Sequence, residues 1–186
     1  SPPPPSSSRP HRRMRTLQET AQALTSTLHL PTLLEVIADR AVRLIGAEGC
    51  AVFELDPLDE RLYPRATHGM PPSETLAPMR LGQGAAGSAA LGRQVIFSPD
   101  VEGQPLPMYD DLWPEAGTTL RDVVRQLGYR AILAVPLVTR ETVVGAVCLY
   151  WNQAHAYDER EVQLLTSLAQ FAAIAIENAR LYETIR

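Results

Sequence analysis

Two long apolar segments in the second half of the chain constrain its fold more than any other feature. Residues 129–138 (YRAILAVPLV) and 142–151 (TVVGAVCLYW) are rich in β-branched and aromatic residues and are separated by only a few residues, as in a hairpin of two strands. Successive side chains of a strand point to opposite faces of a sheet. Because these segments are apolar on both faces, the sequence predicts a central sheet that other elements cover on both sides.

Amphipathic helices at the two ends can supply one of these covers. Residues 14–28 carry apolar side chains at spacings of three and four until Pro31 ends the pattern. A second helix is predicted from the capping-box pair Thr32 and Glu35 to Gly46. Its apolar stripe comprises Leu34, Ile37, Ala41 and Leu44. The domain therefore opens on two consecutive helices.

A long C-terminal helix is predicted to begin at Asp158 and Glu161, a further capping-box pair, and to run to residue 186. Shorter elements fill the middle of the chain. We expect a strand hairpin at 49–56 and 61–69, a loop at 70–80, a short helix at 85–93, a short strand at 94–98, an irregular segment at 99–121 and a short helix at 122–128. An irregular segment as long as 99–121 exceeds a simple connection in a compact domain, and such a segment usually packs over another part of the domain.

The chain is expected to form one domain with a tail. Residues 1–13 (SPPPPSSSRPHRR) include four consecutive prolines and offer nothing to a core, which predicts a disordered Pro/Ser-rich linker or tail. Residues 14–186 are predicted to form a single domain, because a chain of 186 residues with 45% hydrophobic residues can bury one core of ordinary size.

Charge and hydropathy limit the partners of the chain. The net charge is −4 and the arginines are scattered among acidic residues, which argues against a nucleic-acid partner. No segment approaches the eighteen or so apolar residues of a spanning helix, and the N-terminus lacks the apolar core of a signal peptide. We expect no membrane contact in this segment and a cytoplasmic location.

The types of reactive side chain exclude several chemistries. All 17 basic residues are arginine, so there is no Schiff-base lysine, Walker lysine or serine–lysine nucleophile. Cys50 and Cys148 lie far apart in apolar segments without a metal-ligand spacing, which predicts buried, reduced thiols and leaves a redox pair as the alternative. His68 and His155 each lack a second ligand nearby, so we predict no metal site.

Three glycines raise the question of a dinucleotide site. Gly82, Gly84 and Gly87 form the pattern G-x-G-x-x-G, and Asp100 follows a short apolar segment. The dinucleotide fingerprint needs a strand before the first glycine and a full helix after the third. The preceding residues contain Pro78 and no β-branched run. The sequence therefore favours glycines that allow a tight entry into a short helix close to the sheet.

Four segments, in this order, resemble a GAF domain, the small-molecule-sensing module of many signalling proteins. They are residues 24–56, 80–101, 129–151 and 157–183. The resemblance implies an α+β, profilin-like fold with a central antiparallel sheet in the strand order 2-1-5-4-3. It also implies that the terminal helices cover one face of the sheet and that a ligand-pocket layer covers the other.

The motifs of GAF subgroups with known ligands are incomplete in this chain. The Asn-Lys pair of the cyclic-nucleotide group is replaced by Asn152 and Gln153, so the usual ion pair of that lysine cannot form. Bilin-binding members commonly carry a histidine beside the attachment cysteine, and neither Cys50 nor Cys148 has one. The resemblance therefore disfavours a cyclic nucleotide or a bilin and implies no particular cofactor.

The resemblance implies a non-catalytic sensing module of a bacterial signal-transduction protein, such as a sensor histidine kinase or a diguanylate cyclase. Its terminal helices would pass the state of an unknown small-molecule ligand to a covalently linked output domain. One alternative is a stand-alone redox enzyme of the free methionine sulfoxide reductase type, whose members use several cysteines. Another is a structural dimerisation module with a vestigial pocket.

Aromatic residues on and around the long irregular segment are the candidate ligand contacts, together with polar groups that could orient a ligand. They are Phe97, Met108, Tyr109, Asp111, Trp113, Arg121, Tyr129 and Arg130. The alternative is that the aromatic rings only hold the segment against the sheet. A homodimer is expected through apolar seams of the terminal helices. The seam residues are Met14, Leu17, Ala21, Leu24, Leu28, Ala172, Ala175, Ala179 and Tyr182.

Overall fold

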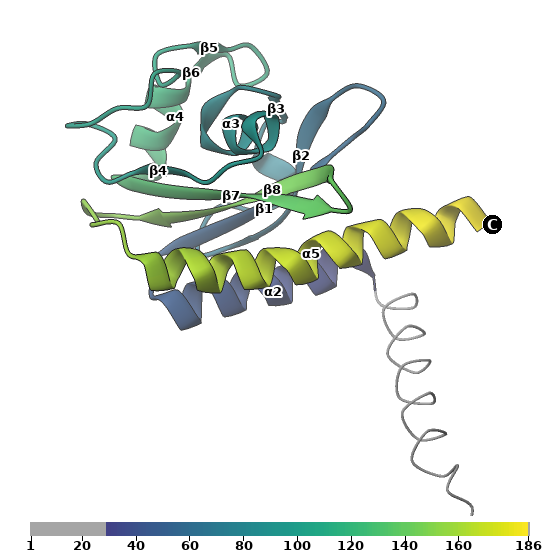
Figure 1. Ribbon diagram of the computed structural model, residues 1–186. Coiled ribbons are helices and arrows are strands. Elements are labelled where there is room, and N and C mark those ends of the chain that lie inside the picture. Colours follow the sequence, from purple (N-terminus) through teal and green to yellow (C-terminus); the bar gives the residue numbers. More distant parts are fainter. Residues whose placement is uncertain (1–28, 186) are drawn as a thin grey trace, which may run out of the picture.

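A curled antiparallel sheet of six strands organises the protein (Figure 1). The structure, a computed structural model, describes residues 29–185. The strands are β1 (Gly49–Leu55), β2 (Arg61–His68), β3 (Met79–Arg80), β4 (Ile96–Ser98), β7 (Ala131–Thr139) and β8 (Thr142–Trp151). Their order is β3-β2-β1-β8-β7-β4. The five strands expected from the sequence are joined by the short edge strand β3, which lies in the segment predicted as a loop.

The two apolar segments form the antiparallel hairpin of β7 and β8, as the sequence predicts. Thr139 pairs with Thr142, so the turn between the strands consists of Arg140 and Glu141. Both turn residues have positive φ, 45° and 71°, as in the tight turns whose twist matches that of antiparallel strands. β8 is buried from Val144 to Trp151, because elements pack on both of its faces.

Two helices cover one face of the sheet, α2 (Leu30–Ile45) and α5 (Glu159–Ile185). Figure 1 shows them side by side beneath the strands, with α5 extending past α2 toward the C-terminus. Alternate residues of the central strands, among them Val52, Leu133 and Leu149, share one apolar cluster with the buried stripes of these helices. This cluster is the larger half of the core.

The start of α2 differs from the prediction. The helix begins at Leu30, His29 occupies the N-cap position without a side-chain cap, and Pro31 lies in the first turn. Proline is favoured there because the first backbone N–H groups of a helix have no intrahelical partner. The predicted capping box of Thr32 and Glu35 is therefore wrong. The predicted end is confirmed, since Gly46 terminates the helix in the left-handed region at φ 86°.

The predicted capping box of α5 is correct at one position only. The carboxylate of Asp158 accepts a hydrogen bond from the backbone N–H of Arg160 at 2.9 Å, as an N-terminal cap does. The Glu161 carboxylate instead lies 2.6 Å from Nε2 of His155. The imidazole of His155 in turn stacks on Trp151 with ring centroids 4.1 Å apart. Glu161 thus holds the loop before the helix.

Short elements cover the opposite face. They are η1 (Ser73–Thr75), α3 (Gly84–Gly92), the two-stranded ribbon of β5 (Leu112–Trp113) and β6 (Thr118–Thr119), and α4 (Leu120–Leu127). A Cβ at Gly87 would lie 2.4 Å from the carbonyl oxygen of Arg80. α3 can therefore approach the turn before it only because residue 87 is glycine, in agreement with the close-packing interpretation of the three glycines.

Two predicted segments lie outside the described residues, the tail 1–13 and the helix 14–28. Within residues 29–185, no helix combines the length and the apolar character that crossing a bilayer requires. The described part of the chain also contains no group of three or more His, Cys, Asp or Glu side chains placed to hold a metal ion.

Candidate functional site

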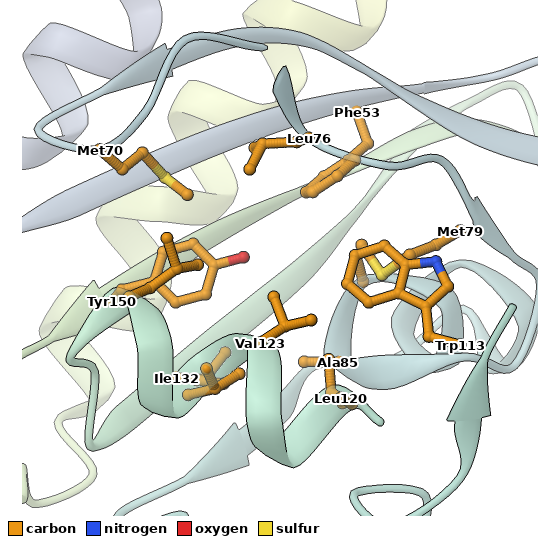
Figure 2. A pocket seen from close by; sticks show the side chains of 13 residues that line it. Phe53, Met70, Leu76, Met79, Ala85, Trp113, Leu120, Val123, Ile132 and Tyr150 are labelled. Carbon is orange, nitrogen blue, oxygen red and sulfur yellow. The ribbon is translucent and has the colours of Figure 1, made fainter. Parts of the chain in front are cut away.

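A small apolar cavity lies between the sheet and the layer of short helices. Its volume is about 40 Å³, and Figure 2 shows the side chains that surround it. They are Phe53, Met70, Leu76, Met79, Ala85, Ala86, Trp113, Leu120, Val123, Val124, Leu127, Ile132 and Tyr150. Since a buried water needs about 10–15 Å³ of such space, the cavity in this state holds a few atoms at most.

The strand period places three residues on the sheet side of the cavity. Phe53 of β1, Ile132 of β7 and Tyr150 of β8 line it, while at least one sequence neighbour of each belongs to the cluster on the side of α2 and α5. α4 closes the other side with its entire apolar stripe. The stripe consists of Leu120, Val123, Val124 and Leu127, at the spacing of one helix face.

Two lining side chains carry a polar atom. The indole Nε1 of Trp113 donates a hydrogen bond to the carbonyl oxygen of Pro78 at 2.7 Å and is thereby engaged. The hydroxyl of Tyr150 points toward the middle of the cavity in Figure 2. Burial raises the pKa of Tyr150 well above its ordinary value, and the neighbouring thiol of Cys148 acts in the same direction. Tyr150 therefore presents a neutral hydroxyl near the space.

Of the eight ligand contacts expected from the sequence, only Trp113 lines the cavity. Tyr129 lies behind the wall, where its ring stacks on Tyr150 with centroids 4.9 Å apart. Its hydroxyl donates to the carbonyl oxygen of Gly69 at 3.1 Å. Tyr129 thus supports a wall residue without reaching the cavity itself.

Phe97 was expected in the pocket, and the structure places it on the other face of the sheet. It packs against the helix-side cluster, and its ring meets Tyr157 edge-on at 5.4 Å. A strand of three residues, Ile96–Ser98, gives too short an alternation for the sequence to decide which face each residue takes.

Tyr109 belongs to the long segment 99–121. Its side chain is fully buried and does not line the cavity. The guanidinium of Arg121 lies 4.5 Å from the centre of the Tyr109 ring. Burial raises the pKa of Tyr109 to about 12. Its hydroxyl has no hydrogen-bond partner among the described residues. Met108 and Asp111 lie on the same segment, half-buried and exposed, and neither lines the cavity. Tyr109 thus packs in the core beside the cavity and does not line it.

The arginines around the cavity are bound to carboxylates of the enclosing segments. Arg121 pairs with Asp110, and the other pairs are Arg80 with Glu115 at 3.1 Å, Arg125 with Glu102 at 2.8 Å and Arg130 with Asp100 at 2.8 Å. Hydrogen bonds from these guanidinium groups lower the pKa of Asp100, Glu102 and Asp110. Arg121 and Arg130, two expected ligand contacts, therefore hold the segment together and do not enter the cavity.

Sequence reasoning missed most of the lining, although two signals for it were present. β1 alternates between the two faces, so Phe53 had to oppose Val52 once the helix face was known. The short helix predicted at 122–128 has one apolar stripe. A short amphipathic helix that packs on a sheet must turn that stripe inward. Met70, Leu76 and Met79 lie in irregular or very short elements, and no periodic signal marks them.

The two cysteines lie on opposite sides of the sheet. Both are buried and reduced, as the sequence predicts. Cys50 belongs to the helix-side cluster and Cys148 to the cavity-side cluster. Cys148 nevertheless does not line the cavity.

The expected dimer seam of α5 needs correction. Ala172 and Ala175 are 0% and 3% exposed within a single chain, because their side of the helix covers the sheet. Ala179 is half-buried and Tyr182 is exposed. Besides Tyr182, the exposed large apolar side chains of the helix are Phe171, Ile174 and Leu181, and these three we call the outer stripe of α5. The expected seam residues from Met14 to Leu28 lie outside the described residues.

Comparison with known proteins gives a consistent result. Residues 27–177 match a family model described as a GAF domain. The GAF domain of a phosphoenolpyruvate-protein phosphotransferase from Coxiella burnetii is similar, with 21% identity, a TM-score of 0.68 and coverage of 92% of this chain and 96% of that one. A methyl-accepting chemotaxis protein is 18% identical, with a TM-score of 0.65 and coverage of 86% of this chain and 96% of that one. The free methionine-R-sulfoxide reductase from Neisseria meningitidis, solved with its substrate, is 17% identical, with a TM-score of 0.62 and coverage of 86% of each chain.

Proposed function

Because this chain belongs to the GAF domain family, we propose that it is a small-molecule-sensing regulatory module of a larger signalling protein and has no catalytic activity of its own. The observation that carries the proposal is the double role of the central strands. β1, β7 and β8 each present one residue to the cavity and the next to the terminal helices. Cavity and helices therefore share one set of strands.

The shared strands give a ligand a physical route to the helices. Ile132 lines the cavity and is followed directly by Leu133, which packs with α2 and α5. On β8, Tyr150 lines the cavity and is followed directly by Trp151, which packs in the same helix-side cluster. A ligand that moves the cavity wall displaces backbone that also holds α5, and it shifts the population of helix positions if it binds one of them better.

The relatives support a module that works on a covalently linked output domain. Similar structures come from a phosphotransferase and from a chemotaxis protein, and in this chain the 27-residue helix α5 extends past the sheet and past α2 (Figure 1). A helix of that kind can continue into a neighbouring domain. We propose that α5 is the output element, in a cytoplasmic part of a bacterial signalling protein.

The redox-enzyme alternative has a similar structure in its favour, the methionine-R-sulfoxide reductase. The positions of the thiols favour the sensor. Reduction of a sulfoxide by thiols needs one cysteine that attacks at the substrate and a second that resolves the product as a disulfide. Here the sheet backbone separates Cys50 from Cys148, and neither thiol lines the cavity.

Dimerisation is part of the proposal, through the outer stripe of α5. Phe171, Ile174 and Leu181 are each about half exposed or more, and an exposed apolar stripe on a helix is a common association surface. A dimer across a two-fold axis would set two α5 helices side by side. The purely structural alternative shares this surface and differs in having no ligand.

Hydrogen exchange along α5, with and without a compound that raises the thermal stability of the chain, tests the sensing function. A ligand at 100 times its dissociation constant stabilises the fold by roughly 2.7 kcal/mol. We expect it to protect α4 directly and to change exchange in α5, which it does not contact. Stabilisation with no change in α5 would contradict the proposal and favour a pocket without output.

A further inference from the structure

The lining of the cavity indicates the chemical class of its ligand. We propose that the cavity takes an uncharged, mainly apolar molecule, aromatic or aliphatic, with one oxygen that accepts a hydrogen bond from Tyr150. An anion, a nucleotide or an amino acid does not fit this site. The inference rests on the proposed sensing function, which it makes more specific.

The first argument is the absence of charge in the wall. None of the 13 lining side chains is ionisable near neutral pH. Moving a charged group from water into such surroundings is costly unless an opposite charge or several hydrogen bonds meet it there. A carboxylate, a phosphate or an ammonium group would find neither.

The second argument is that the nearby cations are already bound. Arg121 and Arg125, on the helix that closes the cavity, pair with Asp110 and Glu102. Arg80 and Arg130 pair with Glu115 and Asp100. A ligand phosphate or carboxylate could recruit one of them only by displacing its carboxylate. The resulting loss would offset the gain.

The third argument is the single directed polar group. Trp113 already donates its indole N–H to a backbone carbonyl. The Tyr150 hydroxyl points into the space and is hydrogen-bonded to the Cys148 thiol, a weak partner that a ligand oxygen can replace. A neutral hydroxyl in an apolar wall orients one polar atom of a ligand. One donor matches one acceptor oxygen.

The fourth argument concerns size and entry. A cavity of 150 Å³ in another protein accommodates benzene, so the present 40 Å³ must grow by roughly 100 Å³ for a ring of that size. α4 is the element to move, because it supplies four lining residues, spans only Leu120–Leu127 and lies outside the central sheet. Outward movement of α4 enlarges the space without breaking a strand pair.

Trp113 provides a direct measurement of occupancy. The other tryptophan, Trp151, lies in the helix-side cluster, so the Trp151→Phe chain reports from the cavity alone. Titrating this chain with toluene and p-cresol should change its fluorescence in a saturable manner. Benzoate, phenyl phosphate and cyclic AMP at the same concentrations should leave it unchanged.

Tyr150→Phe separates the hydrogen bond from the apolar contact. The substitution should weaken the binding of p-cresol by about three- to tenfold, the usual effect of one neutral hydrogen bond. The affinity for toluene should stay within about twofold of that of the chain with Tyr150. If the substitution weakened the binding of both compounds equally, or of neither compound, the role assigned to Tyr150 would be overturned.

Variants of α4 locate the binding. Val123→Phe should fill the cavity and abolish binding of both neutral probes, whereas Leu127→Ala should enlarge it and strengthen binding of 2-naphthol. The matched control is Gln126→Ala, at an exposed position of the same helix. This variant should change neither the binding of the neutral probes nor that of 2-naphthol. Because the first two variants act in opposite directions, loss of folding in one of them leaves the other to decide.

The outcomes distinguish the ligand class from the sensing function. Tighter binding of benzoate, phenyl phosphate or cyclic AMP than of the neutral probes would overturn the class and leave the sensing function standing. Neutral binding without any change of hydrogen exchange in α5 would leave the class standing and remove the sensing function. Failure of both neutral probes up to their solubility limits would overturn the class proposal.

Discussion

Cys50 and Cys148 lie on neighbouring strands of the sheet and point to its opposite faces. Cys148 pairs with Ala51 across β1 and β8, one position from Cys50, and the two side chains belong to different core clusters. A disulfide needs Cβ atoms about 3.5–4.5 Å apart and directed at each other. This pair could meet that requirement only if one strand reversed its faces.

We predict that both thiols react slowly in the folded protein. Burial raises the pKa of Cys148 to about 12 and that of Cys50 above its ordinary range, so the reactive thiolate is scarce at pH 8. Labelling with a chromogenic disulfide reagent should be slow in buffer and rapid in urea, where the pKa values return to about 8.5. Cys50→Ala and Cys148→Ala chains assign the two rates. Rapid labelling of either thiol in buffer would reopen redox chemistry.

The packing of α3 predicts opposite results at two of its glycines. Gly87→Ala should cost about 1–3 kcal/mol of unfolding free energy, as overpacking does, because the new Cβ would lie 2.4 Å from a backbone oxygen. At Gly92 the nearest atoms belong to the flexible side chain of Gln94, at 3.0 Å and beyond. Gly92→Ala should be neutral or slightly stabilising. Urea unfolding measures both, and equal effects would contradict the close approach at Gly87.

The indole N–H of Trp113 fastens the ribbon of β5 and β6 over the cavity. Trp113→Phe removes its 2.7 Å hydrogen bond to the half-buried carbonyl of Pro78, so we expect a loss of about 0.5–1.5 kcal/mol in unfolding free energy. Leu112→Ala, next to it and 63% exposed, should change stability by less than about 0.5 kcal/mol. A Trp113→Phe chain as stable as the wild type would show that the ribbon is held elsewhere.

The sheet and its helix face could be predicted because their signals are long. β7 and β8 have nine and ten residues, enough for alternation and apolar content to define strand and burial together. The cavity face is built from short elements, such as β3 and β5 with two residues each. Periodicity has no meaning over two residues, so Met79 and the ends of the ribbon had no sequence signature.

The errors at α2 and α5 have different physical causes. At α2, Pro31 suits a helix interior poorly and a first turn well, and the pattern alone did not decide between the two. At α5, two stripes of apolar residues have the same spacing, one with Ala172 and one with Ile174. Sequence shows that both exist, but only the packed sheet determines that the stripe of small residues lies inward, where the helix can approach closely.

Acid should loosen the segment 99–121 before the sheet. Arginine hydrogen bonds lower the pKa of Asp100, Glu102 and Asp110 in the folded chain. A carboxyl with a lowered folded pKa contributes stability above its unfolded pKa of about 4, and this stability is lost as the pH falls through the folded pKa. Protection factors for amides of the segment should therefore drop below pH 4, while those of β7 and β8 persist.

Two substitutions in the segment test the same ion pairs at neutral pH. Asp110→Asn removes the charge that holds Arg121 and should lower protection of the segment, by a small amount because exposed pairs contribute little. Asp111→Asn, at the next position and exposed, is the matched control. An acid transition in which segment and sheet lose protection together would contradict the local role of these pairs.

The outer stripe of α5 predicts how the proposed dimer can be broken without unfolding the chain. Ile174 is 49% exposed and Ala172 is fully buried two positions earlier. Ile174→Glu and Phe171→Glu should therefore dissociate the dimer in sedimentation experiments and leave the thermal unfolding of the monomer nearly unchanged. Ala172→Glu places an unpaired charge in the core and should unfold the chain. A wild-type chain that stays monomeric at high micromolar concentration would contradict the dimer proposal. Dissociation by neither surface variant would instead move the interface away from this stripe.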